Sequence, residues 1–337
     1  MQAILQDAYG AAGVWRAGQI TVPEIAASEV LIRVHAAGLD RGTWHLLAGE
    51  PYLVRLVCGL RKPRNRVPGL DVAGTVAAAG AQVTRFAAGD EVFGIARGSF
   101  AEYAPARAGK LAHKPASLTF GQAAAVAVSG LTALQGLRDV GRLRPGQHVL
   151  IIGASGGVGT FAVQIGKALG AQVTGVCSPA KAGLVASIGA DHVLDYTRDD
   201  FANGAQRYDL ILDLAGNTPL SRLRRALTAT GTLVLAGGEN AGRWTGMSRQ
   251  LRALALSPFV RQRFTMLVSR QRQADLEHLA QLIEAGQLTP VIDTAYPLHE
   301  AADAMRHLVA GHARGKITIS VDHAQRGHPH LPAIETH

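Results

Sequence analysis

The stretch that decides the fold is His148–Gly159, which reads HVLIIGASGGVG. Residues 149–152 are all Val, Leu or Ile, which is typical of a buried strand. Four of the next seven residues are glycine; such a turn lets a phosphate approach the backbone, and the amides opening the following helix attract its charge. We therefore predict a strand, turn and helix that bind the pyrophosphate of a dinucleotide, although Ala154 stands where the first glycine of such a turn is usual. The predicted contacts are Gly153, Ala154, Ser155, Gly156, Gly157, Val158 and Gly159.

The residues around this turn predict a parallel sheet. Val158, Phe161 and Ile165 lie on one face of the predicted helix, which ends at Gly170. Apolar strands alternate with stretches suited to helices, a pattern typical of a doubly wound α/β domain. The five predicted strands are His148–Ile152, Gln172–Cys177, His192–Tyr196, Tyr208–Leu214 and Gly231–Ala236.

The end of the second strand indicates which dinucleotide binds. An NAD site normally has Asp or Glu there for the ribose hydroxyls, whereas a carboxylate would repel the 2′-phosphate of NADP. Here the strand ends VCSP at residues 176–179, and no acid occurs before Asp191. We predict NADPH as cofactor, with Ser178 and Lys181 binding the 2′-phosphate. The alternative for Lys181 is an ordinary exposed lysine at the start of a helix.

The rest of the chain predicts a β-rich unit and a short C-terminal addition. Residues 1–120 contain alternating stretches such as Val30–His35 and several glycine-containing turns, which indicate many short strands. Towards the end, Asp275–Ala285 and Leu298–Ala310 have the apolar spacing of amphipathic helices, and Lys316–Val321 reads as a final strand.

Composition excludes several classes of protein. The chain has 337 residues, 47% of them hydrophobic and 18% charged, which predicts two folded domains rather than disorder. No apolar run reaches the roughly 18 to 20 residues that cross a bilayer. The first residues lack the basic start and apolar block of a secretion signal, so a cytoplasmic location is expected, and the two cysteines are expected to be free thiols.

The net charge of +9 raises the question of a phosphate-rich partner. The excess gathers in residues 55–66 and 243–272, and neither stretch contains an acid. We interpret both as solvated or phosphate-facing surface, with a subunit or membrane-surface contact and nucleic-acid binding as alternatives. Within the second stretch, Met247–Met266 has a pattern that suits a lid, a dimer contact or a helix lying on a membrane surface. We expect it to pack against the cleft or against a second subunit.

Several motifs together resemble the medium-chain dehydrogenase/reductase superfamily, and within it the zinc-free quinone-oxidoreductase-like branch. The resemblance covers about residues 1–321. It implies a GroES-like β-rich catalytic domain at residues 1–122, completed by 285–337, around a Rossmann dinucleotide-binding domain at 123–284. It also implies a homodimer. The motifs are Pro68–Gly74, Gly89–Gly94, Ala125–Leu134, Gly153–Gly159, Gly189–Val193 and Gly311–Lys316.

The resemblance implies further cofactor contacts. Thr132 matches a position near the nicotinamide, and Tyr196 matches one near the adenine-ribose phosphate. Their alternatives are a helix threonine bonded to its own backbone and a core tyrosine. Ala215 and Gly237, which follow the fourth and fifth predicted strands, complete the predicted cofactor set.

Comparison with zinc-dependent relatives predicts a reaction without zinc. Those relatives use a Cys, a His followed by Glu, and a third Cys or Asp, whereas the first two positions here are Asp40 and Leu70-Asp71. Two cysteines cannot build the four-cysteine structural site either. Without a metal to polarise a carbonyl, hydride addition to an electron-poor quinone or conjugated C=C remains feasible.

The predicted catalytic residues are Asp40, Trp44 and Tyr52. Asp40 could stabilise positive charge on the oxidised nicotinamide, pair with Arg41 or be protonated in an apolar cleft. Trp44 and Tyr52 are either substrate walls or packing residues, and the Tyr52 hydroxyl could donate a hydrogen bond.

Together these features predict an NADPH-dependent, zinc-independent reductase of quinones or α,β-unsaturated carbonyls. One alternative is an NADPH-binding regulatory or RNA-binding protein with little turnover, for which the basic stretches are the motive. Another is a tailoring reductase of secondary metabolism, which differs only in its substrate.

Overall fold

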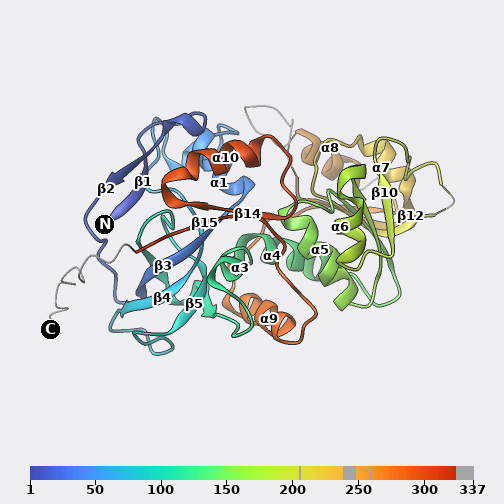
Figure 1. Ribbon diagram of the computed structural model, residues 1–337. Coiled ribbons are helices and arrows are strands. Elements are labelled where there is room, and N and C mark those ends of the chain that lie inside the picture. The colour runs from blue at the N-terminus through green and yellow to red at the C-terminus, as the bar shows by residue number, and fades with distance from the viewer. Residues whose placement is uncertain (205, 238–247, 258–259, 324–337) are drawn as a thin grey trace.

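The structure, a computed structural model, describes residues 1–204, 206–237, 248–257 and 260–323. It contains two large sheets that lie side by side, the mostly antiparallel one at the left of Figure 1 and the parallel one at the right. The predicted α/β class, a β-rich unit beside a parallel sheet, is confirmed.

The parallel sheet has six strands in the order β10-β9-β8-β11-β12-β13. The five predicted strands are all present, but β12 begins earlier than expected and β13 was not predicted. Part of the region expected to form a lid, dimer contact or surface helix is thus an edge strand that pairs with β12. The strands are β8 (His148–Ile152), β9 (Gln172–Cys177), β10 (His192–Asp195), β11 (Tyr208–Asp213), β12 (Leu227–Leu235) and β13 (Arg263–Met266).

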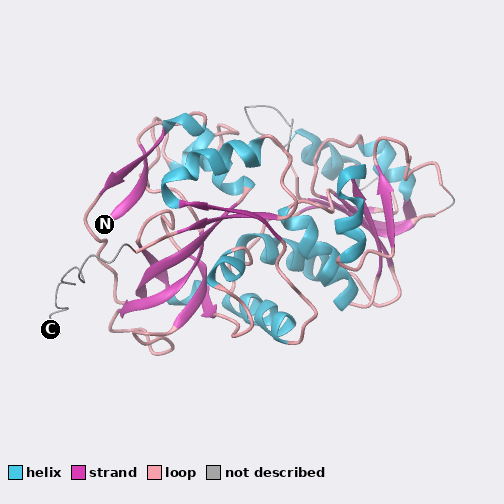
Figure 2. Ribbon diagram, viewed as in Figure 1, coloured by secondary structure: helices cyan, strands magenta, loops and turns pink. Residues whose placement is uncertain are grey.

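Helices cover both faces of this sheet (Figure 2). Val149 and Ile151 of β8 pack in the core cluster that contains Phe161, whereas Leu150 and Ile152 pack in the cluster on the opposite face. A strand buried on both sides needs apolar residues at every position, which explains the run VLII. The helices are α4 (Ala127–Leu134), α5 (Gly157–Ala168), α6 (Ala182–Ser187), α7 (Leu220–Ala226), α8 (Ser248–Leu256) and α9 (Gln273–Glu284).

The mostly antiparallel sheet contains strands from both the N-terminal and the C-terminal parts of the chain. Its order is β14-β15-β3-β4-β5-β7, with β6 also paired to β3. The final strand, β15, runs antiparallel to β3, so the predicted return of the C-terminal segment to the N-terminal unit is confirmed. Strand β14 was not predicted. The strands are β3 (Glu29–Leu39), β4 (Asp71–Ala79), β5 (Glu91–Ile95), β6 (Tyr103–Arg107), β7 (Leu111–His113), β14 (Ile292–Pro297) and β15 (Lys316–Ser320).

Smaller elements complete the β-rich part. A hairpin of β1 (Gln2–Gln6) and β2 (Trp15–Gln19) forms a separate sheet, and α10 (Ala301–Val309) packs against β14 and β15. Helices α1 (Arg41–Ala48), α2 (Val54–Cys58) and α3 (Phe120–Ala124) occupy the connections. The domain boundaries at residues 122/123 and 284/285 stay predictions; the strands divide into 29–113 with 292–320, and 148–266.

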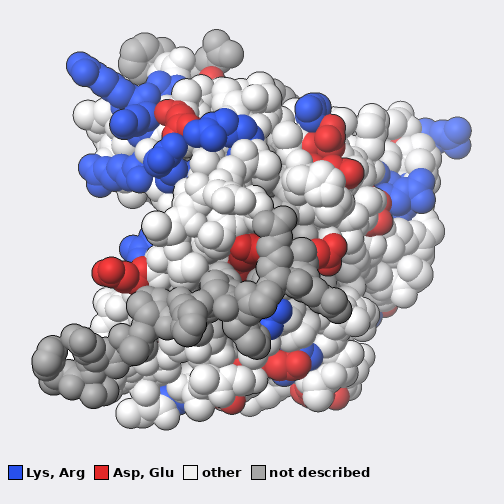
Figure 3. All heavy atoms as spheres, turned by 60° about the vertical axis from the view of Figure 1, so that its left-hand side comes forward, with Lys and Arg blue, Asp and Glu red and all other residues white. Residues whose placement is uncertain are grey.

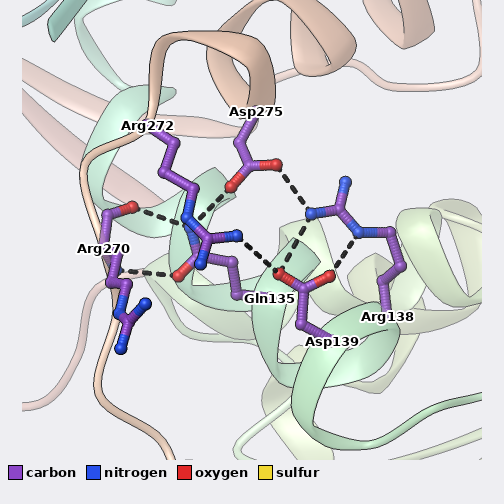
Figure 4. Close-up of polar contacts among 6 residues, drawn as sticks. All are labelled: Gln135, Arg138, Asp139, Arg270, Arg272 and Asp275. Carbon is purple, nitrogen blue, oxygen red and sulfur yellow. Dashed lines mark hydrogen bonds and ion pairs between the residues drawn. The ribbon is translucent and has the colours of Figure 1, made fainter.

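A polar network fixes the chain between β13 and α9 (Figure 4). Asp275, in the first turn of α9, is buried and accepts hydrogen bonds from Gln135 Nε2 at 2.8 Å and Arg138 Nη2 at 2.6 Å. Gln135 also exchanges two hydrogen bonds with the backbone of Arg270. The hydrogen bond from Arg138 lowers the pKa of the Asp139 carboxyl. The network ties the π-helix Gln135–Val140 to the start of α9.

Candidate active site

The glycine-rich turn has the shape that close phosphate approach requires. Gly153 has a φ of +89°, a conformation that favours glycine, and Gly156 precedes the first residue of α5. A Cβ on Gly159 would lie 2.1 Å from the Gly153 carbonyl oxygen, so α5 can approach β8 only with glycine there. A Cβ on Gly156 would meet only that same oxygen, at 3.5 Å. The open space at Gly156, in front of the α5 amides, fits a pyrophosphate.

The C-terminal segment braces this turn. The Gly315 amide donates to the Ser155 carbonyl oxygen at 3.0 Å, and Gly156 and Gly315 form an isolated parallel bridge. The next residue, Lys316, runs so close to α5 that a Cβ on Gly157 would lie 3.0 Å from its Cδ. The dinucleotide turn and the β-rich unit are therefore in direct contact.

A pocket of about 730 Å³ opens beside the turn, between the ends of β8, β9 and β11 and the chain after α10. Six of the thirteen predicted cofactor residues line it: Gly153, Ser155, Ser178, Lys181, Tyr196 and Ala215. Residues that the sequence did not indicate also line it, among them Arg222, Thr218 and His312.

The far end of this pocket is basic. Lys181 is half-buried and its Nζ donates to the carbonyl oxygens of Ala313 at 2.8 Å and Gly311 at 3.2 Å. Burial lowers the pKa of its ammonium group. Arg222 packs on the Phe201 ring and pairs with Asp200 at 2.8 Å. Both cations could contact a phosphate placed in this pocket.

The remaining predicted cofactor residues do not line this pocket. Ala154 is buried, and Val158 lies half-buried in the first turn of α5. Thr132 Oγ1 donates to the Val128 carbonyl oxygen at 2.7 Å, which is the back-bonded alternative considered for it. The Gly237 amide donates to the Asp213 carbonyl oxygen at 3.0 Å, at the sheet edge that also carries the turn. Their contacts with a cofactor stay predictions.

A second pocket, of about 470 Å³, lies in the β-rich unit and fits a substrate. Leu46, Leu70 and Ile95 form an apolar part of its lining, and Glu29, Arg97, Arg107 and Lys110 add charged side chains. Leu70 occupies the position at which zinc-dependent relatives carry a histidine. The wall near the surface includes Val57, Cys58 and Arg64, and burial raises the pKa of the Cys58 thiol. A cleft of this kind can take an apolar acceptor and exclude water from it.

Asp40 lies at the start of α1 and caps it. Its Oδ1 accepts hydrogen bonds from the Thr43 backbone nitrogen at 2.8 Å and from Thr43 Oγ1 at 3.2 Å. Its Oδ2 is buried and has no hydrogen-bond partner within the described chain. The cap explains Asp at this position structurally, and Oδ2 is a buried acceptor that no group of the described chain satisfies.

A buried ion pair lies next to Asp40. Lys316 Nζ is 3.0 Å from Asp71 Oδ2, and both side chains are almost completely buried. The Val128 amide donates to Asp71 Oδ1 at 2.7 Å. Burial raises the pKa of Asp71 to about 6 and Asp40 adds to the rise, while Lys316 opposes it. In the sequence, Asp71 belongs to the Pro68–Gly74 motif and to the pair Leu70-Asp71 that replaces the His and Glu of zinc-dependent relatives, and Lys316 ends the Gly311–Lys316 motif. Their pairing was not predicted; a lysine opening the strand KITIS was the available signal.

Trp44 and Tyr52 have packing partners in the β-rich unit. Trp44 packs against the core cluster that contains Ala301 and Met305. The Tyr52 ring lies under the Arg55 guanidinium, with 4.7 Å between the Arg55 Cζ and the ring centroid. Neither residue, nor Asp40, lines either pocket described above, so their predicted catalytic roles remain untested by the structure.

The described residues contain no group of three His, Cys, Asp or Glu side chains placed to hold a metal ion. In the same part of the chain, no helix is long and apolar enough to cross a bilayer. Zinc independence and the cytoplasmic location stay predictions.

The fold and the braced glycine turn define the class: the chain belongs to the medium-chain dehydrogenase/reductase superfamily, in its quinone-oxidoreductase-like branch. Residues 26–116 match the alcohol dehydrogenase GroES-like domain, and residues 188–319 match a family described as zinc-binding dehydrogenase. The chain is 32% identical to the chloroplast envelope quinone oxidoreductase homolog of Arabidopsis thaliana, over 95% of this chain and 98% of the relative.

Solved structures agree with this assignment. The quinone oxidoreductase from Coxiella burnetii superposes with a TM-score of 0.83 at 29% identity, over 96% of this chain and 99% of that one. Mycobacterial Rv1454c complexed with NADPH gives 0.82 at 27% identity, over 95% and 100% of the two chains. The protein is therefore an oxidoreductase that binds a pyridine nucleotide.

Proposed function

We propose that the protein transfers a hydride from NADPH to a quinone or an α,β-unsaturated carbonyl, without zinc, as a cytoplasmic homodimer. The observation that carries the proposal is the pair of pockets: one at the dinucleotide turn that contains Lys181 and Arg222, and one in the β-rich unit that is partly lined by Leu46, Leu70 and Ile95. The names of the relatives and the NADPH complex of a similar structure support it.

The glycine turn and the basic pocket would bind different parts of NADPH. Residues 153–159 would hold the pyrophosphate against the amides of α5, and Ser178, Lys181 and Arg222 would bind the 2′-phosphate. When bound, NADPH supplies the hydride. Thr132 would lie towards the nicotinamide, from where it is expected to help orient the ring.

The residues of the apolar pocket suit reduction of an already electron-poor acceptor. Leu46, Leu70 and Ile95 would contact the apolar part of the acceptor, and an acceptor activated by its own conjugation needs no Lewis acid. Asp40 lies close to the buried Asp71–Lys316 ion pair and would add negative potential there. That potential would stabilise the positive charge that appears on oxidation of the cofactor. Trp44 and Tyr52 would contact the substrate as it enters.

The test is a turnover assay with purified protein, NADPH, and a panel of soluble quinones and enones. We expect loss of reduced-cofactor absorbance, slower turnover with NADH, and no effect of a chelator. Absence of turnover across the panel would refute the proposal, and inactivation by the chelator would refute its zinc-free form.

Lys181→Ala tests the choice of cofactor. Removing the cation should weaken NADPH binding about tenfold and leave NADH binding within about twofold, because only NADPH has the 2′-phosphate. Calorimetric titration measures both constants. Lys167→Ala is the matched control, because Lys167 is a half-exposed lysine paired with Asp191 outside the pocket. Equal loss of both cofactors in Lys181→Ala would contradict the assignment.

A further inference from the structure

One surface segment exposes an unusual number of apolar side chains. In the described part of the chain, eight large hydrophobic residues are exposed, and four of them lie within residues 53–60. Leu53 is 46% exposed, Leu56 62%, Val57 75% and Leu60 68%. Aliphatic side chains gathered in this way indicate a surface that meets an apolar partner.

Cations border these side chains. Arg61, Lys62 and Arg64 are exposed, and the chain has no Asp or Glu between Glu50 and Asp71. We call Leu53, Leu56, Val57, Leu60, Arg61, Lys62 and Arg64 the docking patch. Figure 3, which views the molecule from the side of the β-rich unit, shows Lys and Arg gathered at one edge above a hollow in the surface.

The backbone beneath the docking patch is held in place. The Arg55 guanidinium lies between the Tyr9 and Tyr52 rings, at 4.6 and 4.7 Å, and its Nε donates to the Gly49 carbonyl oxygen at 2.9 Å. The Tyr9 hydroxyl donates to the Gly59 carbonyl oxygen at 2.6 Å. The aliphatic side chains are therefore presented outward by a braced loop.

The chemistry of the docking patch favours a bilayer surface with anionic lipids over RNA. Aliphatic side chains beside cations suit the boundary between acyl chains and charged headgroups. Proteins that bind single-stranded RNA stack its bases on aromatic rings, and none of the seven patch residues is aromatic.

The docking patch is continuous with the apolar pocket. Val57 and Arg64 belong to both, and the pocket runs inward from them to Leu70 and Ile95. We propose that the docking patch binds anionic membrane surfaces, so that a quinone or enone dissolved in the bilayer enters the pocket directly. The inferred membrane contact depends only on the docking patch. The entry of a quinone or enone also depends on the proposed function.

Vesicle co-sedimentation of the full chain tests the contact. We expect binding to vesicles of phosphatidylcholine mixed with phosphatidylglycerol, little binding to phosphatidylcholine alone, and loss of binding as salt rises. Leu56→Asp with Leu60→Asp should reduce binding about tenfold. Val309→Asp, which changes an exposed apolar residue outside both basic stretches, should leave it within about twofold.

The charges are tested in the same assay. Arg61→Glu with Lys62→Glu should reduce binding about tenfold, and the exposed pair Arg142→Glu with Arg144→Glu should not. Equal losses in test and control variants, equal binding to both vesicle types, or binding of single-stranded RNA in place of vesicles would overturn the proposal. So would a change of oligomeric state in the patch variants, because a second copy would then be the partner.

Activity separates this inference from the proposed function. Leu56→Asp with Leu60→Asp should keep wild-type turnover of a soluble short-chain quinone and lose about tenfold towards a long-chain quinone carried in vesicles. Equal turnover of the vesicle-borne quinone would overturn the delivery step. Vesicle binding without turnover of any acceptor would instead leave the contact standing and refute the reductase.

Discussion

Two glycines of the dinucleotide turn have different roles at the scale of single residues. Gly159 allows α5 to pack on the Gly153 carbonyl, whereas Gly156 has open space at the place a Cβ would occupy. The first is required for folding, and the second is required only if a phosphate occupies that space.

Alanine at each position distinguishes these roles. Gly156→Ala should cost less than about 1 kcal/mol of unfolding free energy but weaken NADPH binding about tenfold. Gly159→Ala should cost about 3 kcal/mol, because its Cβ would overlap the Gly153 carbonyl. Urea denaturation and calorimetric titration measure the two quantities. Wild-type NADPH affinity in Gly156→Ala would place the pyrophosphate elsewhere.

Local sequence predicted some site residues and missed others. The turn, Ser178 and Lys181 were found because adjacent residues in the chain determine their places around β8 and β9. Arg222 was missed because it follows a later strand, and its place in the pocket depends on how β11 pairs with β8. The Asp71–Lys316 pair joins residues far apart in the chain, which no spacing rule reveals.

At the scale of elements, α9 depends on one buried carboxylate. Asp275→Ala removes the acceptor of Gln135 and Arg138 and should lower the free energy of unfolding by about 2 kcal/mol. Asp303→Ala is the matched control: Asp303 pairs with Arg306 in the first turn of α10 but is exposed, so its loss should cost less than about 0.5 kcal/mol. Equal costs in urea denaturation would contradict the role of the network.

The chain after β15 docks on β3 through a histidine that should make stability depend on pH. His323 Nε2 donates to the Val34 carbonyl oxygen at 2.8 Å, and His35 stacks on Phe120 with 4.3 Å between ring centroids. Burial lowers the pKa of both rings below 6.5. The charged groups that act on these rings are Arg33, Glu91, Glu102 and Asp322, and His323 itself lowers the pKa of His35.

Because the folded pKa is lowered, the unfolded chain takes up more protons below pH 6.5, and stability falls as pH drops through that range. His323→Asn should reduce the loss of unfolding free energy between about pH 8 and about pH 5, whereas the exposed His299→Asn should leave it unchanged. Denaturation at both pH values measures the loss. An identical loss in His323→Asn would show that other groups cause it.

Strong apolar patterns predicted five strands of the parallel sheet and the helices α5, α9 and α10, whereas short strands of mixed composition were missed. β13 reads RFTM and has one buried side chain, Phe264, so its place in the sheet depends on pairing with β12 rather than on its own pattern. β14 reads IDTAYP and has no fully buried residue. These two segments form strands because the fold places a partner strand beside each of them.

At the scale of the whole molecule, several contacts join the two sheets. Besides the Ser155–Gly315 bond, Arg85 pairs with Glu277 at 2.6 Å, and the Ala116 amide donates to Glu284 at 2.7 Å. The arrangement of the two units was expected from the family resemblance, not from the spacing of residues, because spacing does not show that the last strand returns to the first sheet.

These contacts predict one cooperative unfolding transition. NADPH at about a hundredfold excess over its Kd should raise the free energy of unfolding by about 2.7 kcal/mol and shift the whole transition. Differential scanning calorimetry with and without cofactor tests both points. Two separate transitions, with only one of them moved by NADPH, would show that the units unfold independently.

The brace on the dinucleotide turn has a consequence for biosynthesis. A ribosome makes Ser155 long before Gly315, so the nascent polypeptide passes through a stage in which its phosphate-binding loop has no support from behind. We therefore expect a stalled or truncated product that lacks the last strand to bind the coenzyme more weakly than the finished molecule does.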